Sequence, residues 1–261
     1  MPDTSSSLTT RDEQPYALIT TTGPDSPLSI VEVNLGGSPL RIDKLTRVTI
    51  PGGEGRQWLV KGLRGDERFD ELTGIIVHQQ TSRTYYAEAY SGGGKPPDCS
   101  SNDGITGSPG VAGITACAIC PMNQWETASS GRGKACAEYI NVFLLPSERS
   151  LPIVVRISPG SLGALDDFMQ ALSGELLRRD RVVIAIGLED GGGYSRARFR
   201  LVRELEADEA VEARQYIEHF GNLVRGNTAP PDIVVDQGVE PAYVDDEPPP
   251  HTIAPDDIPF G

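Results

Sequence analysis

The sequence lacks the long apolar runs and the nucleophile motifs that mark two large classes of protein. No hydrophobic stretch approaches the ~20 residues that a helix needs to cross a bilayer, and no basic segment followed by an apolar one opens the chain. Histidine occurs only three times, at scattered positions, and no G-x-S-x-G elbow is present. We therefore expect a protein of the cytoplasm that is neither membrane-bound nor secreted, and we find no sign of an enzyme.

Cysteine is scarce as well, but its four copies are regularly placed. Cys99, Cys117, Cys120 and Cys136 have the spacing C-x17-C-x2-C-x15-C. In a reducing compartment such a set is more typical of thiols or metal ligands than of disulfides. Four thiolates suit tetrahedral zinc and leave no open position for catalysis. The pattern predicts a structural Zn²⁺ ion in a zinc ribbon over residues 95–137.

Two alternatives to zinc remain open for these cysteines. They could be four unrelated reduced thiols, or the C-x2-C pair could be a thioredoxin-like redox centre. A redox pair normally opens a helix after a strand, whereas Cys117 and Cys120 lie among glycine-rich loops. That context favours the metal.

Positive charge is in short supply, since the formal net charge is −14. The acid is concentrated in one place: residues 228–261 hold eight acidic side chains, eight prolines and no Lys or Arg. Removing this stretch takes the formal charge of the remainder from −14 to −6. A Pro-rich segment of uniform charge cannot supply a packed core, so we expect a disordered acidic tail over 227–261. The polar residues 1–14 are expected to be disordered too.

Between these ends, short β-rich runs are broken by glycine and proline. Residues 15–70, with the runs YALITTT, LSIVEVNL, RVTI and QWLV, predict a β-rich extension packed on the core, with Trp58 inside it. Residues 71–226 predict the main domain.

The main domain shows five strand signals and two helices. Leucine, Phe and Met recur at three- and four-residue spacings over 161–179, a helix that Ser158 or Ser161 can cap. A second amphipathic helix is expected to end at Gly226. A helix between strands three and four of five is the order of an OB barrel. We therefore predict a mainly β fold with a few helices: an OB-fold barrel with an inserted zinc ribbon and a C-terminal helix. The expected strands are 74–81, 138–145, 151–157, 181–188 and 195–205.

Alternating arginines mark a possible path for nucleic acid. Arg196, Arg198 and Arg200 alternate with apolar residues, so a strand would place their guanidinium groups on one face. Tyr194, in the glycine-rich loop before them, is placed to stack on a base. A solvated outer face is the alternative interpretation of this strand.

Further candidates for DNA contact lie in and before the ribbon. They are aromatic and basic residues, and for Trp125 packing against the barrel is an equal alternative. The set is Trp125, Arg132, Lys134, Arg83, Tyr85 and Tyr86.

The last residues have the chemistry of a docking peptide. Asp256 and Asp257 precede Ile258, Pro259 and Phe260, so two carboxylates could meet a basic rim while the apolar pair enters a pocket on a partner. The sequence D-D-I-P-F resembles the C-terminal tip of bacterial single-stranded DNA-binding proteins. That tip recruits replication, recombination and repair enzymes, and in that family the chain ends on the phenylalanine.

The body of the chain carries a second resemblance. A zinc ribbon inserted between strands one and two of an OB fold resembles the C-domain of the large subunit of replication protein A. The stretches CPMNQW and GRGKAC are similar to single-strand-binding proteins of phages and integrative elements. These resemblances imply sequence-tolerant binding and protection of single-stranded DNA, in a chain that could form homo-oligomers. A recombination mediator or strand-annealing protein, and a zinc-ribbon adaptor that binds no DNA, remain as alternatives.

Overall fold

The computed structural model describes residues 27–225 except 37, 39, 54, 89–94, 130 and 148. The predictions for residues 1–14, for YALITTT and for the acidic tail lie outside this range. The helices are α1 (Pro27–Leu35), α2 (Leu162–Gly174) and α3 (Ala207–Arg225); the strands are β1 (Arg47–Thr49), β2 (Trp58–Gly62), β3 (Gly65–Phe69), β4 (Glu71–Tyr85), β5 (Cys99–Ser101), β6 (Thr106–Val111), β7 (Ile114–Ala116), β8 (Cys136–Leu145), β9 (Ile153–Ile157), β10 (Val182–Asp190) and β11 (Ser195–Glu204).

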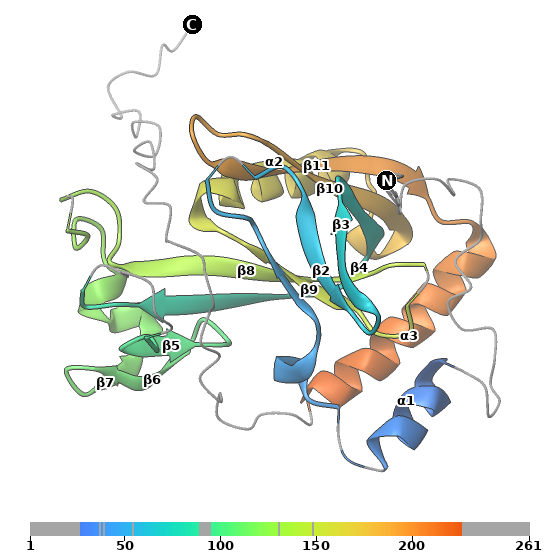
Figure 1. Ribbon diagram of the computed structural model, residues 1–261, viewed down its shortest axis with the longest axis horizontal. Coiled ribbons are helices and arrows are strands. Elements are labelled where there is room, and N and C mark those ends of the chain that lie inside the picture. Colours follow the sequence, from blue (N-terminus) through green and yellow to red (C-terminus); the bar gives the residue numbers. More distant parts are fainter. Residues whose placement is uncertain are drawn as a thin grey trace, which may run out of the picture.

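The fold is mainly β and is built around the long strand β4 (Figure 1). The main sheet has the order β11–β10–β4–β8–β9–β1, and only the β1–β9 pair is parallel. Residues 71–74 of β4 pair with β10, and residues 75–85 pair with β8. The last residues of β4 also pair with β5, which attaches the small strands β5, β6 and β7 to that end of the sheet.

Both faces of this sheet are buried over part of its area. On β8, Val142 and Leu144 point to one face and Phe143 and Leu145 to the other, as the two-residue period of a strand requires. The first face packs against α2 and the β2–β3 hairpin. The second packs against α3 and α1. The strands β5, β6 and β7 and the turns that follow them up to Cys136, called the ribbon below, adjoin the end of β4 that is farthest from Glu71.

The N-terminal extension contributes to the core. Trp58 has no exposed surface, and its Nε1 donates a hydrogen bond of 2.9 Å to the Ile186 carbonyl. The prediction that Trp58 is a core residue is confirmed, and RVTI and QWLV form strands as expected. LSIVEVNL, by contrast, is the helix α1 and not a strand.

The boundaries of α1 explain why the strand prediction was wrong. Pro27 has the fixed backbone angle that suits the first helical turn. Gly36 follows the helix at φ +58° and donates its N–H to the Val33 carbonyl, the left-handed termination that glycine allows. With Val31 buried against the sheet, this start and stop override the strand preference of the β-branched residues between them.

The described strands form no closed barrel, which corrects the predicted closure. β11 pairs with β10 alone, and the outer edge of β9 is taken by β1. The β2–β3 hairpin, a separate two-stranded sheet, packs its buried residues into the core that β10 and β11 share with the rest. A closed barrel would need the edges of β9 and β11 to meet, and the N-terminal segment packs there instead.

The helix α2 ends five residues earlier than predicted. The Leu177 N–H bonds the Leu172 carbonyl and Leu176 adopts φ +60°, so the helix closes with a Schellman-type turn. Ser161 does not cap it as predicted: its hydroxyl accepts a hydrogen bond of 2.9 Å from the Ala197 N–H of β11. Neither does the side chain of Ser158 make a capping bond.

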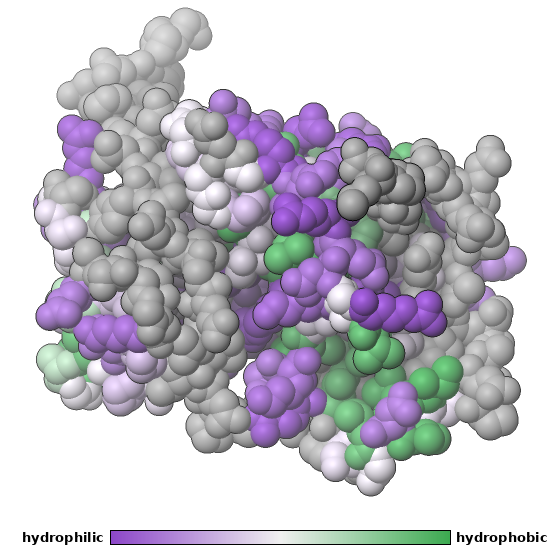
Figure 2. Space-filling model, viewed as in Figure 1, coloured by the Kyte–Doolittle hydropathy of each residue, from purple (hydrophilic) through white to green (hydrophobic). Residues whose placement is uncertain are grey.

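The surface around α1 is apolar. Figure 2 shows hydrophobic residues gathered at the lower right of the view, around α1, where Ile30 and Val33 are exposed, and Leu63 at the hairpin turn is fully exposed. No helix among the described residues is both long and apolar enough to cross a membrane.

Candidate metal centre and nucleic-acid interface

Two of the cysteines are held by strands next to the end of β4. Cys99 is the first residue of β5 and Cys136 the first residue of β8, and Tyr85 of β4 lies opposite both. The ladder therefore brings together two residues that are 37 positions apart in the chain. Their separation is set by the pairing of three strands, not by a flexible loop.

The other two cysteines come from consecutive tight turns. Cys117 opens the 3-10 turn Cys117–Ile119, and Cys120 lies between it and the 3-10 turn Pro121–Asn123. The Cys120 N–H donates to the Cys117 carbonyl, which fixes the spacing of the pair. A C-x2-C pair on such a turn is the arrangement that presents two sulfurs to one metal ion.

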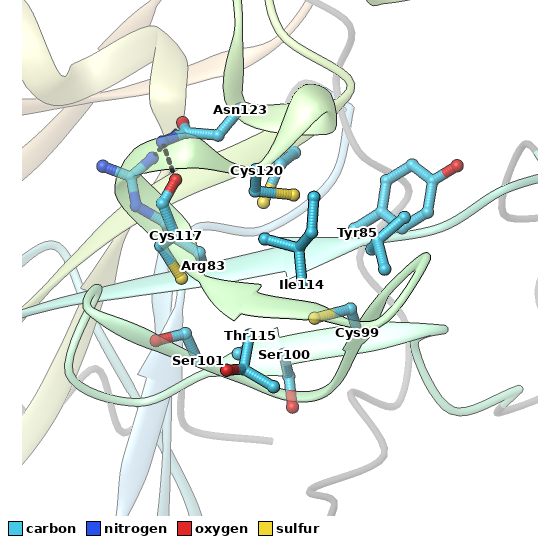
Figure 3. A pocket seen from close by; sticks show the side chains of 13 residues that line it. Arg83, Tyr85, Cys99, Ser100, Ser101, Ile114, Thr115, Cys117, Cys120 and Asn123 are labelled. Carbon is cyan, nitrogen blue, oxygen red and sulfur yellow. Dashed lines mark hydrogen bonds between the residues drawn. The ribbon is translucent and has the colours of Figure 1, made fainter.

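All four cysteines line a single small cavity of about 10 Å³ (Figure 3). No disulfide joins any of them. The four thiols therefore share one cavity, while a metal ion among them stays a prediction.

The close approach of the sulfurs depends on Gly107. A Cβ added there would lie 2.8 Å from Cys99 Sγ and 3.9 Å from Cys117 Sγ. Glycine at this position therefore leaves room for the cluster, and the backbone of β6 forms one wall of it.

Binding of a metal ion would change the protonation of these thiols. Burial raises the pKa of the Cys99 thiol, and burial raises the pKa of Cys136 to about 12, with the nearby Cys117 and Cys120 adding to both and Arg83 opposing the rise at Cys136. Without an ion these two thiols stay protonated at neutral pH. Among the described residues no group of three or more Cys, His, Asp or Glu is already arranged to hold a metal. Zinc binding would draw the sulfurs together and release their protons.

Arg83 belongs to this centre. It lines the same cavity, its side chain is only 14% exposed, and it forms an ion pair with Glu138 on β8. Its Nη1 donates to Asn123 Oδ1 at 2.7 Å and its Nε to the Gly104 carbonyl at 3.3 Å. The sequence assigned Arg83 to DNA contact, but its three nitrogens are directed into the ribbon and the sheet.

The predicted arginine row is present, but it has internal partners. Arg198 and Arg200 both pair with Glu71 of β4, at 3.3 and 2.6 Å, and remain about half exposed. These arginines hold the pKa of Glu71 below its usual value, the hydrogen bond from Arg200 being the main cause. Arg196 donates to the Gly160 carbonyl at 3.0 Å. Such pairing fits a solvated outer face as well as a phosphate track, so DNA contact by this strand stays a prediction.

The loop before the row is also internally bonded. Asp190 Oδ1 accepts hydrogen bonds from the Gly192 and Gly193 N–H groups, at 2.9 and 3.3 Å, and pairs with Arg56. The backbone amides that could have held a phosphate therefore already bind a carboxylate. Tyr194 follows on the same loop and is half-buried.

The remaining candidates are divided between the ribbon and the end of β4. Trp125 is 52% exposed, and Lys134 lies 5.6 Å from its ring centroid, so the indole is not packed away. Arg132 is exposed in the same segment. Tyr85 lines the cysteine cavity, and Tyr86 directly follows β4.

An aromatic and basic pair on the sheet was not predicted from the sequence. On the face that α3 partly covers, Arg156 of β9 lies over the ring of Tyr139 of β8, with 3.7 Å from its Cζ to the ring centroid. Arg156 Nη2 also donates to Thr84 Oγ1 of β4 at 2.9 Å. We call the surface formed by Ser82, Thr84, Tyr139, Asn141 and Arg156 the Tyr139 face. Strand alternation could have found it, because Tyr139 and Asn141 interrupt the apolar run of β8 with period two.

The Tyr139 face has unsatisfied polar atoms. Ser82 is 6% exposed and Asn141 is 4% exposed, yet Ser82 Oγ and Asn141 Oδ1 have no hydrogen-bond partner within the described part of the chain. A buried polar atom without a partner costs free energy. Such atoms usually have a water or a ligand as their partner.

The predicted docking tip, Asp256 to Phe260, lies outside the described residues. Comparisons of the chain with protein-family models, curated proteins and solved structures find no match. Any functional conclusion rests on the residues themselves.

Proposed function

We propose that this protein binds single-stranded DNA on the Tyr139 face, beside a zinc centre that braces the sheet. The observation that carries the proposal is the stacking of Arg156 on Tyr139. An aromatic ring and a guanidinium plane on an open sheet are the groups on which unpaired bases stack.

The strand connectivity supports this proposal. β4 pairs with both β8 and β10, β8 with β9, and β10 with β11, and α2 lies between β9 and β10. An OB fold has this order, and OB folds bind oligonucleotides on the face of strands two and three, which correspond to β8 and β9. We regard the domain as an open variant of that fold with a ribbon inserted after its first strand.

Zinc is the ion we propose for the cysteine centre. Four sulfur donors favour zinc over cations that prefer oxygen ligands. A ribbon with so little apolar core also needs such an ion for stability. Cys99, Cys117, Cys120 and Cys136 would hold it. Its contribution is structural, because four protein ligands leave no position for a substrate.

The tail completes the proposal. The D-D-I-P-F tip carries two acidic and two apolar side chains at the end of a Pro-rich acidic stretch. We propose that it recruits replication, recombination or repair proteins while the domain holds DNA. Protection of single strands and partner recruitment would then be separable activities of one chain.

The test compares two variants with a charge-matched control. Fluorescence anisotropy with oligo-dT and with a duplex of equal length is measured at two salt concentrations. Tyr139→Leu should weaken single-strand binding about fivefold to a hundredfold, the range for loss of one stacked base. Arg156→Gln should lower the salt slope by about 0.7, the value for one phosphate contact on a single strand. Lys61→Gln, an exposed lysine on the β2–β3 hairpin, should behave as the native protein.

Three outcomes would count against the proposal. Equal affinity for duplex and single strand would remove the single-strand assignment. If Tyr139→Leu and Arg156→Gln both bind single-stranded DNA with native affinity, the Tyr139 face is not the binding surface. No binding to either DNA would favour the zinc-ribbon adaptor, and acceleration of pairing between complementary strands would favour an annealing protein.

A further inference from the structure

Arg83 is placed between the two parts that the proposed function joins. It lies on β4 directly opposite Glu138 of β8 and Ser101 of β5. Its side chain points to the ribbon side of the sheet, whereas the neighbouring Thr84 belongs to the Tyr139 face. Arg83 therefore contacts the cysteine cavity from the same strand that contributes Thr84 to the Tyr139 face.

The hydrogen bonds of Arg83 reach both halves of the ribbon. Gly104, in the loop after β5, accepts from Nε, and Asn123, in the turn after Cys120, accepts from Nη1. Asn123 in turn donates its Nδ2 to the Cys117 carbonyl at 2.8 Å. Arg83 is thus one hydrogen-bonded residue away from the C-x2-C pair (Figure 3).

The positive charge of Arg83 is the second feature that matters to the cysteine cavity. A zinc ion with four thiolates carries a net charge of −2, and a buried anion needs a compensating cation. Of the described residues that line the cavity, Arg83 is the only Lys or Arg. Glu138 pairs with it from the more exposed side, with 34% of its side chain exposed. The carboxylate therefore offsets part of the charge that the guanidinium supplies.

We propose that Arg83 is a positioning residue of the metal centre, which compensates the charge of the zinc thiolates and ties both halves of the ribbon to the sheet. This inference rests on the proposed zinc site. Bracing alone and charge compensation predict different results at Glu138. If Arg83 only braces the ribbon, removing either member of the pair weakens zinc binding. If charge dominates, loss of the Glu138 carboxylate strengthens it.

The experiment measures zinc affinity of the full-length chain by competition with a chromophoric chelator, and the cobalt absorption spectrum as a report of sulfur ligation. Arg83→Gln should weaken zinc about tenfold or more, as loss of a partner to metal ligands does, while cobalt keeps its four-sulfur spectrum. Arg83→Lys should recover part of the loss. Glu138→Gln should bind zinc as tightly as the native chain or more tightly. Arg64→Gln, on the exposed hairpin turn, is the matched control.

The outcomes separate this inference from the proposed function. Native zinc affinity in Arg83→Gln, or equal weakening in Arg83→Gln and Glu138→Gln, would overturn the assignment. A native chain that binds no zinc would instead overturn the metal centre. If Arg83→Gln does not fold, Glu138→Gln still decides, because weaker zinc binding in that variant contradicts charge compensation.

Discussion

Gly107 gives the sharpest test of the cysteine centre. The substitution Gly107→Ala would place a carbon 2.8 Å from Cys99 Sγ, whereas unbonded heavy atoms prefer about 3.5–4.0 Å. Either the sulfur or the β6 backbone must then move by about 0.7–1.2 Å. Metal ligand distances tolerate about 0.2 Å. We therefore expect zinc affinity to fall at least about tenfold, equivalent to ~1.4 kcal/mol of binding free energy.

Thermal unfolding with and without zinc measures this effect. When zinc is in excess, its binding free energy adds to the stability of the folded state. Loss of ~1.4 kcal/mol should reduce the zinc-dependent rise in Tm by about 3–6 °C in a chain of this size. Gly52→Ala is the control, because its backbone is ordinary and a Cβ there meets nothing within 4 Å. An unchanged zinc-dependent rise in Gly107→Ala would refute the reasoning, since the sulfur cluster would then not need this glycine.

Four further predictions concern Glu71 and the β11 arginines, the tail and the core. Glu71→Gln removes the shared partner of Arg198 and Arg200. If β11 lies on the DNA path, affinity for single-stranded DNA should rise about two- to fivefold at low salt. An unchanged affinity would exclude β11 from that path. The pKa of Glu71 is lowered in the fold, so its stabilisation of about 0.5–1 kcal/mol should be present above pH ~4.5 and lost as the pH falls through the lowered pKa, which Tm values at pH 7 and pH 3 would reveal. Deletion of residues 256–261 should abolish pull-down of repair proteins and leave or strengthen DNA binding; weaker DNA binding would contradict the proposed division of labour. Trp58→Phe loses the bond to Ile186 and should cost about 1–3 kcal/mol in urea unfolding, and no measurable loss would show that this carbonyl finds another partner.

Much of the fold could be predicted because its signals are local. The runs that form β8, β9, β10 and β11 are rich in β-branched residues and bounded by turn residues, and the helix between them has a clear apolar period. Each of those elements is present. The fold class is mainly β, as predicted.

The failures have two causes, competing local signals and contacts that no local pattern encodes. In α1 the β-branched Ile30, Val31 and Val33 lie close together, which indicates a strand. Pro27 and Gly36 nevertheless delimit a helix, and this helix buries Val31. The open sheet depends on the parallel pairing of β1 with β9, which joins residues about one hundred positions apart. Sequence period alone gives no register for such a pair.

The candidate site could be predicted in part for the same reason. Cysteine spacing is a strong signal, and the four thiols do share one cavity. An arginine is a weaker signal of function, because its role depends on which groups it contacts in the fold. Arg83 is half-buried and lines the cysteine cavity, while Arg156, a single arginine in an apolar strand, lies over Tyr139. Composition could not separate these two environments.

β4 explains why a change at one end of the molecule should not reach the other. Near the end of β4, Arg83 and Tyr85 line the cysteine cavity, and Thr84 between them accepts a hydrogen bond from Arg156. Three consecutive residues of one strand therefore serve the proposed metal centre and the Tyr139 face. The first residue of β4, Glu71, binds the β11 arginines at the opposite end, fourteen positions before Tyr85. Between them β4 pairs first with β10 and then with β8, and it is packed on both faces. Loss of the metal ion should therefore disturb the Tyr139 face first and leave the Glu71 pairs intact, because local opening is easiest where the fewest apolar contacts must break.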